Sequence, residues 1–433
     1  MPREKRIVLA TLGSLGDLHP FLALARELRA RGHSPVLATS AIYRGKIEAD
    51  GIEFAPLRPD EPDFGDPEVV FRRGNHPLWG TTYVVLRMIL PHLRASYEDL
   101  LAASRDADLL VSHTLTYAVP LVAEKRGLPW AGASLQPMVF LSAFDPPVLP
   151  LVSRTARLLG LGPGFHRFLY SFIEKTTRSW SRPVRALRRD LGLRPAAVNP
   201  IFGGQHSPFL NLALFSPLFA PPQPDWPPAT IATGFPFYDG GSIGSELMQP
   251  ELRAFLDSGP PPVVFTLGST IVRMPGGFFH ESISALRAME ARAVFVTGTD
   301  PRNQPPGPLP RRLLTVPYAP YGELFPRAAA IVHQGGIGTT AQALRAGRPQ
   351  LVVPHAHDQP DNAARVVRLG IGRSLPPRRY AADRVAATLR SLLDDKACAL
   401  KAAAMGTAIR GEKGALRAAE AIERALGTAK HSG

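Results

Sequence analysis

A cluster of glycine and hydroxyl residues follows a short apolar run in the second half of the chain. The run 330–332 predicts a strand, and a helical pattern over 340–346 follows it. Glycines at such a strand-to-helix turn let backbone N–H groups approach an anion, and the N-terminus of the helix adds positive potential. The residues expected at this phosphate site are His333, Gly335, Gly336, Gly338, Thr339 and Thr340. A turn that needs glycine only for steric reasons is the alternative interpretation.

A carboxylate and an amide stand after the next predicted strand. The run 350–353 leads into a polar loop that contains Asp358 and Gln359. Side chains of these two types can hold neighbouring hydroxyl groups, as on a sugar ring. A solvated loop is an equal alternative for this segment alone, and the phosphate turn upstream favours sugar binding.

A second glycine-bearing turn, Gly13 to Gly16, follows the apolar run 6–12 and precedes Asp17. It lacks the glycine spacing of a dinucleotide fingerprint, and the second predicted strand ends without an acidic residue. A carboxylate here would repel a pyrophosphate but could accept a proton in a cleft. Local sequence alone favours the other interpretation, in which Asp17 caps the helix that follows.

Two patterns are compatible with a metal ion, and we expect neither to hold one. Asp106 and Asp108 have the spacing of metal-dependent sugar transferases, but they begin a predicted strand and so lie at the end of the sheet away from a ligand. His355 and His357 share a polar loop, for which solvation is the simpler interpretation.

Short apolar runs alternate with helical patterns along the whole chain, which predicts two doubly wound, Rossmann-like α/β domains that face a cleft. The predicted strands cover 6–12, 35–39, 109–111, 130–133, 212–215, 262–267, 292–296, 313–316, 330–332 and 350–353. We expect an N-terminal acceptor domain (1–235), a linker (236–246), a C-terminal nucleotide-sugar domain (247–410), and a helix and tail (411–433) that pack on the first domain.

The composition is that of an ordinary globular protein of 433 residues with a net charge of +14. The single cysteine, Cys398, excludes an internal disulfide. Segment 151–200 carries ten basic and two acidic residues, which favours an anionic partner such as a membrane surface or an acidic substrate. Nucleic acid is less favoured because no recognition motif is present. Without a spanning apolar run, we expect a cytoplasmic protein in peripheral contact with an anionic membrane.

Aromatic residues lie near this basic segment and could contact an amphiphilic acceptor. For each single residue, burial in the core is the stronger interpretation. The acceptor-binding candidates are His19, Phe140, Phe144 and Phe168.

Several motifs together resemble the GT-B glycosyltransferases over nearly the whole chain. Within that family the sequence is similar to the bacterial rhamnosyltransferases of rhamnolipid synthesis and to their sterol- and antibiotic-glycosylating relatives. The matching segments are 13–21, 220–227 with 233–236, 265–269, 333–338, and 356–359 with Asp361 and Asn362.

The resemblance implies roles for individual residues. His333 and the backbone after it would take the diphosphate of the donor with Ser269 and Thr270, and Tyr318 would lie at the base-binding strand end. Asp358 and Gln359 would hold sugar hydroxyls. Asp17 occupies the position of the general base, which is a histidine in plant relatives, and His113 stands where those enzymes keep the carboxylate that orients it. An inverted Asp17–His113 pair is therefore a hypothesis.

The function expected from this resemblance is an inverting, metal-independent transfer of a hexose. Rhamnose from dTDP-rhamnose, or another dTDP- or UDP-linked sugar, would pass to a hydroxyl of an amphiphilic acceptor such as a 3-hydroxyalkanoyl fatty acid. No further cofactor is expected. The alternatives are glycosylation of a sterol, polyketide or other small hydrophobic natural product, a sugar-nucleotide epimerase, and a non-catalytic lipid-binding protein. The sequence does not indicate which oligomeric state the protein has.

Overall fold

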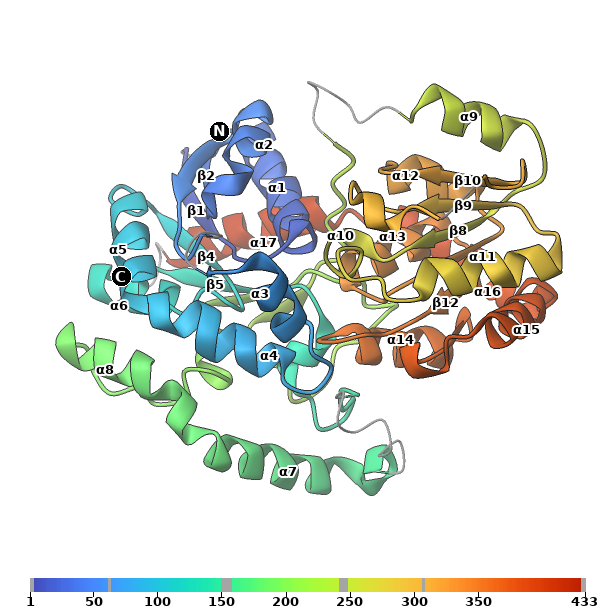
Figure 1. Cartoon of the computed structure of the whole chain (residues 1–433). Coiled ribbons are helices and arrows are strands. Elements are labelled where there is room, and N and C mark those ends of the chain that lie inside the picture. Colours follow the sequence, from blue (N-terminus) through green and yellow to red (C-terminus); the bar gives the residue numbers. More distant parts are fainter. Residues whose placement is uncertain (1–3, 61–63, 149–157, 241–247, 306–307, 430–433) are drawn as a thin grey trace.

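The computed structural model describes residues 4–60, 64–148, 158–240, 248–305 and 308–429. Two parallel sheets lie side by side, each covered by helices on both faces (Figure 1). The predicted fold of two doubly wound, Rossmann-like domains is confirmed.

The first sheet has seven parallel strands in the order β3-β2-β1-β4-β5-β6-β7. Its order reverses direction between β1 and β4, and ligands of such sheets bind outside the carboxyl ends of the strands at this point. The strands are β1 (Arg6–Ala10), β2 (Ser34–Thr39), β3 (Glu53–Pro56), β4 (Leu109–His113), β5 (Trp130–Ser134), β6 (Leu210–Ala213) and β7 (Thr230–Ala232).

The second sheet has six parallel strands in the order β10-β9-β8-β11-β12-β13. Its order reverses between β8 and β11. The strands are β8 (Val263–Thr266), β9 (Ala293–Val296), β10 (Leu313–Val316), β11 (Ala330–His333), β12 (Gln350–Val352) and β13 (Gly372–Ser374).

Alternate residues of the strands face the two helical layers of each domain, as the pleat of a strand requires. In β1, Val8 packs on one side of the sheet and Ile7 and Leu9 on the other. The helices before the linker are α1 (Leu15–Ala30), α2 (Arg44–Ala49), α3 (Pro67–Gly74), α4 (Gly80–Tyr83), α5 (Leu93–Ala103), α6 (Val119–Arg126), α7 (Gly162–Thr176) and α8 (Arg182–Asp190). Those after it are α9 (Pro250–Asp257), α10 (Gly268–Ile271), α11 (Phe278–Met289), α12 (Tyr321–Leu324), α13 (Ile337–Ala346), α14 (Gln359–Arg368), α15 (Ala382–Leu393), α16 (Lys396–Arg410) and α17 (Gly414–Ala429).

The chain crosses between the two domains twice. After β7 it passes to the second domain, and the predicted linker 236–246 lies partly outside the described residues. After α16 it returns, and α17 packs against α1, where Ala418 and Ile422 share a buried cluster with Leu22. Residues from both sides, including Phe219 and Leu344, form a further buried cluster between the domains. No helix of the described residues is long and apolar enough to span a membrane.

Candidate active site between the two domains

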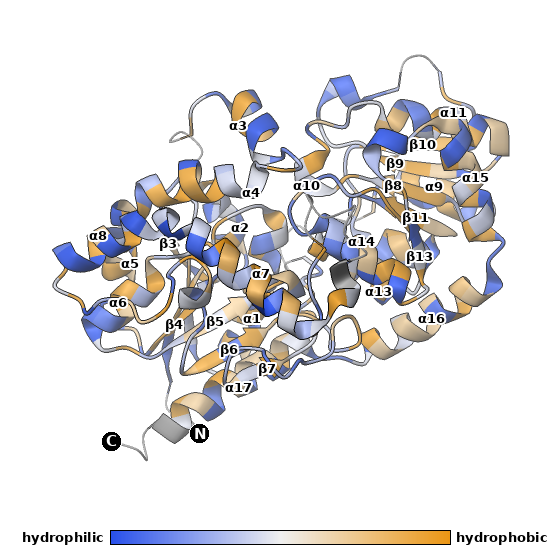
Figure 2. Cartoon of the chain, turned by 90° about the horizontal axis from the view of Figure 1, so that it is seen from below, coloured by the Kyte–Doolittle hydropathy of each residue, from blue (hydrophilic) through white to orange (hydrophobic). Residues whose placement is uncertain are grey.

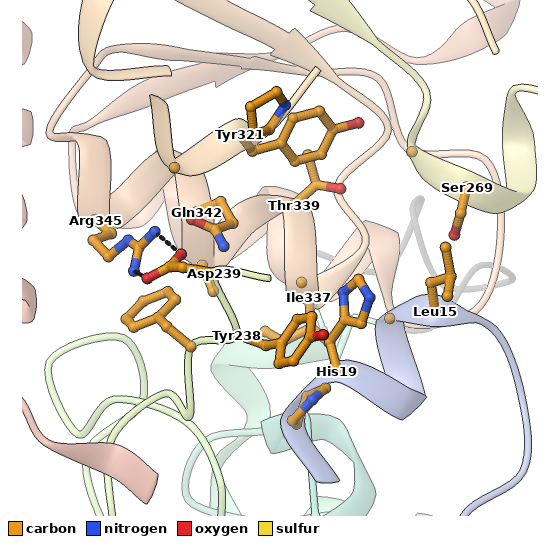
Figure 3. Close-up of a pocket in the computed structure, with 18 of the residues that line it drawn as sticks. Leu15, His19, Tyr238, Asp239, Ser269, Tyr321, Ile337, Thr339, Gln342 and Arg345 are labelled. Atoms are coloured by element: carbon orange, nitrogen blue, oxygen red, sulfur yellow. Dashed lines mark hydrogen bonds and ion pairs between the residues drawn. The ribbon is translucent and has the colours of Figure 1, made fainter. Parts of the chain in front are cut away.

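A cavity of about 1740 Å³ lies between the domains. Its walls come from α1, the segment 235–240, α10, α12, α13 and the crossing at 409–416. Figure 3 shows side chains of α13 facing those of α1 across this space. Five of the predicted site residues line it: His19, Ser269, Tyr318, Gly338 and Thr339.

The glycine turn after β11 presents backbone to the cavity. Gly335 has φ of +88°, and a Cβ there would lie 2.6 Å from Val352 Cγ1, so only glycine fits without strain. Gly336 is the N-cap of α13, and Gly338 and Thr339 lie in its first turn. Because the first N–H groups of a helix have no partner within it, this turn can donate to an anion. Thr340 differs, because it is buried and its hydroxyl donates to the Gly336 carbonyl.

His333 is buried at the end of β11 and uses both ring nitrogens within the protein. Its Nδ1 accepts from the Gly335 N–H at 3.1 Å, so the proton of the neutral ring lies on Nε2, which donates to Gln350 Oε1 at 3.0 Å. Burial lowers the pKa of His333 to about 4. The expectation that His333 donates directly to phosphate oxygens is therefore corrected: it supports the turn whose backbone faces the cavity.

Asp358 and Gln359 lie behind the same turn, at the N-terminus of α14. The Ile337 N–H and the Asn362 side chain both donate to Asp358 Oδ2, at 3.1 and 2.7 Å. Burial raises the pKa of Asp358 to about 7. Gln359 Oε1 accepts from the backbone N–H groups of His355 and Ala356, at 2.8 and 3.2 Å. Both side chains thus brace loops at the cavity, and their contact with a sugar stays a prediction.

Asp17 is both a helix cap and a side chain directed at His113. Helix α1 begins at Leu15, earlier than the sequence predicts, because Ser14 is its N-cap and Asp17 completes a capping box. Asp17 Oδ2 accepts from the Ser14 N–H at 2.7 Å, and Oδ1 lies 3.6 Å from His113 Nε2. A Cβ on Gly13 would lie 2.3 Å from this carboxylate, so the turn requires glycine there. The expectation that Asp17 is the N-cap is therefore wrong, because Ser14 holds that position and Asp17 caps from the first turn of the helix. Its role as a base stays a prediction.

His113 lies buried at the carboxyl end of β4. Burial lowers its pKa, and the opposing effects of the Asp17 charge and the Leu12 backbone are smaller. A neutral imidazole thus stands beside the Asp17 carboxylate.

Helices α1 and α13 meet end to end at the cavity. The Gly16 Cα lies 3.8 Å from the position of a Cβ on Gly338. The capped N-terminus of α1 and the glycine turn of α13 therefore approach each other directly, which places Asp17 beside the predicted phosphate site.

The loop after β8 forms the opposite wall. Ser269 is exposed at the start of α10 and points into the cavity (Figure 3). Thr270 follows it and does not line the cavity. Gly268 has φ of +64°, and a Cβ there would lie 2.2 Å from Gln334 Nε2. Gln334 also donates to Thr339 Oγ1 at 3.3 Å. It was not among the predicted site residues, although its position directly after His333 in the sequence could have indicated it.

The acceptor-binding candidates do not form one site. His19 lines the cavity and stacks on Tyr238 with ring centroids 4.9 Å apart. Phe140 is a core residue packed against Trp226, which contradicts the expected acceptor contact. Phe144 is partly exposed beneath the Arg167 guanidinium, and Phe168 is 70% exposed on α7.

The loop at 142–148 is held by both domains. Asp225 accepts from the Ser142 hydroxyl and the Ala143 N–H, at 2.6 and 2.7 Å. From the second domain, buried Arg365 pairs with Asp145, and Asp361 accepts from the Val148 N–H at 3.0 Å. This network gives structural roles to two of the segments that match the family, because Asp225 belongs to 220–227 and Asp361 follows 356–359.

The two patterns compatible with a metal ion have other surroundings in the structure. Asp108 accepts the Arg6 N–H at 2.9 Å at the start of β1, away from the carboxyl ends of the strands. His355 and His357 lie in the loop before α14. Within the described part of the chain, no group of three histidine, cysteine or acidic side chains could hold a metal ion.

Comparison with known proteins now identifies the family. Residues 7–131 match the N-terminal domain of glycosyltransferase family 28, and residues 284–413 match the C-terminal domain of the erythromycin biosynthesis protein CIII-like family. The chain is 35% identical over 431 residues to O-mycaminosyltylonolide 6-deoxyallosyltransferase of Streptomyces fradiae, covering 96% of this chain and 97% of the relative. The chain belongs to the GT-B glycosyltransferases.

This glycosyltransferase is also 28% identical to a sterol 3-beta-glucosyltransferase of Leptosphaeria maculans, over 99% of its own length but 29% of the length of that relative. Its fold matches the glycosyltransferase VinC in complex with dTDP, with a TM-score of 0.68 and 20% identity, covering 98% of this chain and 100% of VinC. The predicted family, its sterol- and antibiotic-glycosylating relatives and its enzyme class are confirmed. The protein is a nucleotide-sugar glycosyltransferase.

Proposed function

We propose that this enzyme transfers a 6-deoxyhexose such as rhamnose from a dTDP-linked donor to a hydroxyl group of an amphiphilic acceptor, with inversion and without a metal ion. The observation that carries the proposal is the meeting of the two helix N-termini, with Gly16 against Gly338 and Asp17 beside them. It puts a proton acceptor next to a backbone anion site. In this proposal residues 247–410 hold the donor and residues 1–235 the acceptor, and α17 completes the acceptor domain.

The chemistry of the transfer needs both helix ends. An alcohol ionises far above pH 7, so Asp17 takes its proton as the oxygen attacks the anomeric carbon. Negative charge then grows on the departing diphosphate, and the N–H groups of the α13 turn are directed at it. One such donor typically contributes about a hundredfold or more to the rate. His113, uncharged and 3.6 Å away, orients Asp17 in this scheme.

The choice of donor is supported by two relatives. The name of the Streptomyces fradiae enzyme specifies a 6-deoxy sugar, and rhamnose belongs to the same chemical class. The VinC structure contains dTDP. In our chain Ser269, Tyr318 and Thr339 line the cavity where this nucleotide would bind. A UDP-linked donor is the alternative.

The choice of acceptor is supported by the segment that follows β5. Its loop 142–148 is fixed at both ends, and the helix after it carries exposed phenylalanines and basic residues. Both a 3-hydroxyalkanoyl fatty acid and a macrolide-type polyketide present a hydroxyl on an apolar body. We favour the polyketide because the mycaminosyltylonolide of the relative's name is of this type.

A panel of ligands tests the proposal. The protein is heated with dTDP, UDP, dTDP-rhamnose, dTDP-glucose and UDP-glucose, and dTDP-linked sugars should raise its melting temperature most. The best donor is then incubated with polyketide aglycones, sterols and hydroxy-fatty acids, and products are measured by mass spectrometry. A product formed from the donor alone would favour the epimerase instead, and stabilisation by no nucleotide would overturn the proposal.

Peripheral membrane contact is a separate proposal, carried by α7. Phe168 and Phe172 are 70% and 55% exposed and lie on one face of this helix, near Arg167 and Lys175. Figure 2 shows apolar and polar residues mixed along α7, and Figure 1 shows that this helix lies apart from the two sheets. Exposed apolar side chains beside cationic ones suit an anionic bilayer surface.

Sedimentation with vesicles tests this contact. The protein should bind phosphatidylglycerol vesicles at low salt, and Phe168→Ser with Phe172→Ser should weaken binding. Leu400→Ser is the matched control, because Leu400 is 72% exposed on α16, away from the basic segment. Equal binding by all three proteins would refute a role for α7.

A further inference from the structure

The segment containing α3 and α4 (residues 67–83) belongs to the first domain and contacts the second at two places. Thr81 Oγ1 is hydrogen-bonded to His357 Nδ1 at 3.0 Å. The Arg273 guanidinium lies 4.5 Å from the centre of the Phe71 ring. In Figure 1, α3 and α4 lie on the side of the first domain that faces the second. The segment therefore bridges the two domains at the cavity.

The bridge depends on a close approach within the segment itself. A Cβ on Gly80 would lie 2.2 Å from the Gly74 carbonyl oxygen, so glycine is required where α4 begins. The same Gly74 backbone interacts with the His357 side chain. Thr81 and Gly74 thus approach the His357 ring together.

His357 has a left-handed backbone conformation. Its φ is +56°, in a region that only a few per cent of residues other than glycine adopt, histidine being among the more frequent of them. Glycine would fit this position without strain. A residue held in such a conformation by its surroundings points to a function of its side chain.

His357 also stands between the two halves of the candidate site. It precedes Asp358, which accepts the Ile337 N–H at the start of α13. The Asp17 carboxylate acts electrostatically on both His357 and Asp358. His357 therefore lies near both the Asp17 carboxylate and the residue that contacts the start of α13.

We propose that His357 is a positioning residue, which through its hydrogen bond to Thr81 holds the two domains at the separation where Asp17 reaches the acceptor hydroxyl above the bound donor. It touches neither reacting group and acts through domain placement. This inference rests on the proposed base role of Asp17.

His357→Gly tests the proposal without adding backbone strain. Because misplacing reacting groups by about 1 Å can cost a hundredfold in rate, we expect kcat to fall about ten- to hundredfold. The affinity for dTDP, measured by calorimetry, and the melting temperature should stay unchanged. An unchanged kcat, or a loss of dTDP affinity equal to the loss of kcat, would overturn the proposal.

Two further variants separate positioning from a general structural effect. Thr81→Ala should lower kcat in the same way, and the double variant should fall no further, because both changes break one hydrogen bond. Independent, multiplying losses would contradict the proposal. Glu290→Gly is the matched control, since exposed Glu290 also has positive φ, +54°, at the end of α11; its kcat should not change.

Hydrogen exchange distinguishes this inference from the base assignment. With dTDP bound, amides of residues 67–83 should exchange faster in His357→Gly than in the unaltered protein, while Asp17→Asn should leave their exchange unchanged. If Asp17→Asn keeps full turnover, the base role fails, yet faster exchange would still show the domain contact. Exchange that does not change in His357→Gly would refute the contact itself.

Discussion

The N-termini of α1 and α13 are similar in geometry, but only the first turn of α1 contains an acidic residue. Each follows a strand of a parallel sheet through a glycine turn, and the two meet at Gly16 and Gly338. Helix α1 carries its own anion, because Asp17 completes a capping box with Ser14. Helix α13 has glycine as its N-cap, and its Ile337 N–H donates to Asp358 from another loop.

This difference is the basis on which we propose different tasks for the two helix ends. A helix end that already holds a carboxylate repels phosphate and can accept a proton, whereas one that presents glycine backbone can bind phosphate. In the proposed function, the same strand-turn-helix unit serves as base or as anion site according to the residue at the third helical position, Asp17 in α1 and Thr339 in α13.

Removing the charge from α1 should have the largest effect. Asp17→Asn keeps a side chain that can cap the helix but cannot accept a proton, so turnover should fall by about 10²–10⁴-fold. The affinity for dTDP, measured by calorimetry, should not decrease. Retained turnover would show that the two helix ends do not divide the chemistry in this way.

His113→Ala should also lower turnover, and unchanged turnover in this variant would rule out the proposed Asp17–His113 pair.

The turn before α13 depends on an uncharged imidazole, which predicts sensitivity to acid. The pKa of His333 is lowered to about 4, so below its ordinary value of 6.5 the unfolded chain binds a proton that the folded chain does not. Stability is therefore full above pH 6.5 and lost as the pH falls toward 4, by about 2 kcal/mol between pH 7 and pH 5.

Urea unfolding at the two pH values measures this loss. His333→Gln should show a smaller decrease in the free energy of unfolding between pH 7 and pH 5 than the unaltered protein. His280→Gln is the control, because His280 is exposed on α11. Equal pH dependence in all three proteins would contradict the role given to His333.

Two glycines of the α13 turn should respond differently to alanine. In Gly338→Ala the new Cβ meets only Gly16 Cα, at 3.8 Å, so the fold should persist while dTDP binds about tenfold more weakly, about 1.4 kcal/mol. Gly335→Ala should instead lower the melting temperature, because its Cβ would lie 2.6 Å from Val352 Cγ1. Unchanged dTDP affinity in Gly338→Ala would place the diphosphate elsewhere.

The smallest effect is expected at the cap of α1. Ser14→Ala removes the acceptor of the Gly16 N–H, at 3.2 Å, and should lower stability by about 1 kcal/mol. Turnover should change far less than in Asp17→Asn, because the carboxylate remains. A loss of turnover as large as that of Asp17→Asn would mean that the cap, rather than the charge, distinguishes the two helix ends.

The fold was predictable because the central strands are buried on both faces. Continuous apolar runs such as 262–267 and 292–296 indicate such strands, and all ten predicted strands are present. The three strands that were missed, β3, β7 and β13, each lie at the edge of a sheet. Their residues are partly exposed, so they lack the apolar run that marks a central strand.

The site was predictable in outline but not in its hydrogen bonds. The glycine turn and Asp17 were found from motif and resemblance. The structure brings Gly338 of the turn to the cavity, and Asp17 follows Gly16, which also lines it. That His333 supports the turn depends on Gln350, which belongs to the next strand, and no local pattern shows this pairing. That Phe140 lies in the core depends on Trp226, a distant residue. Contacts between separate elements decide both cases.

The position of α17 has a consequence for the synthesis of the protein. Ala418 and Ile422 of α17 are buried in one cluster with Leu22 of α1. Residues 414–429 leave the ribosome only after the whole second domain has been made. The first domain therefore emerges with an apolar surface uncovered, and it reaches its final packing last although its translation comes first.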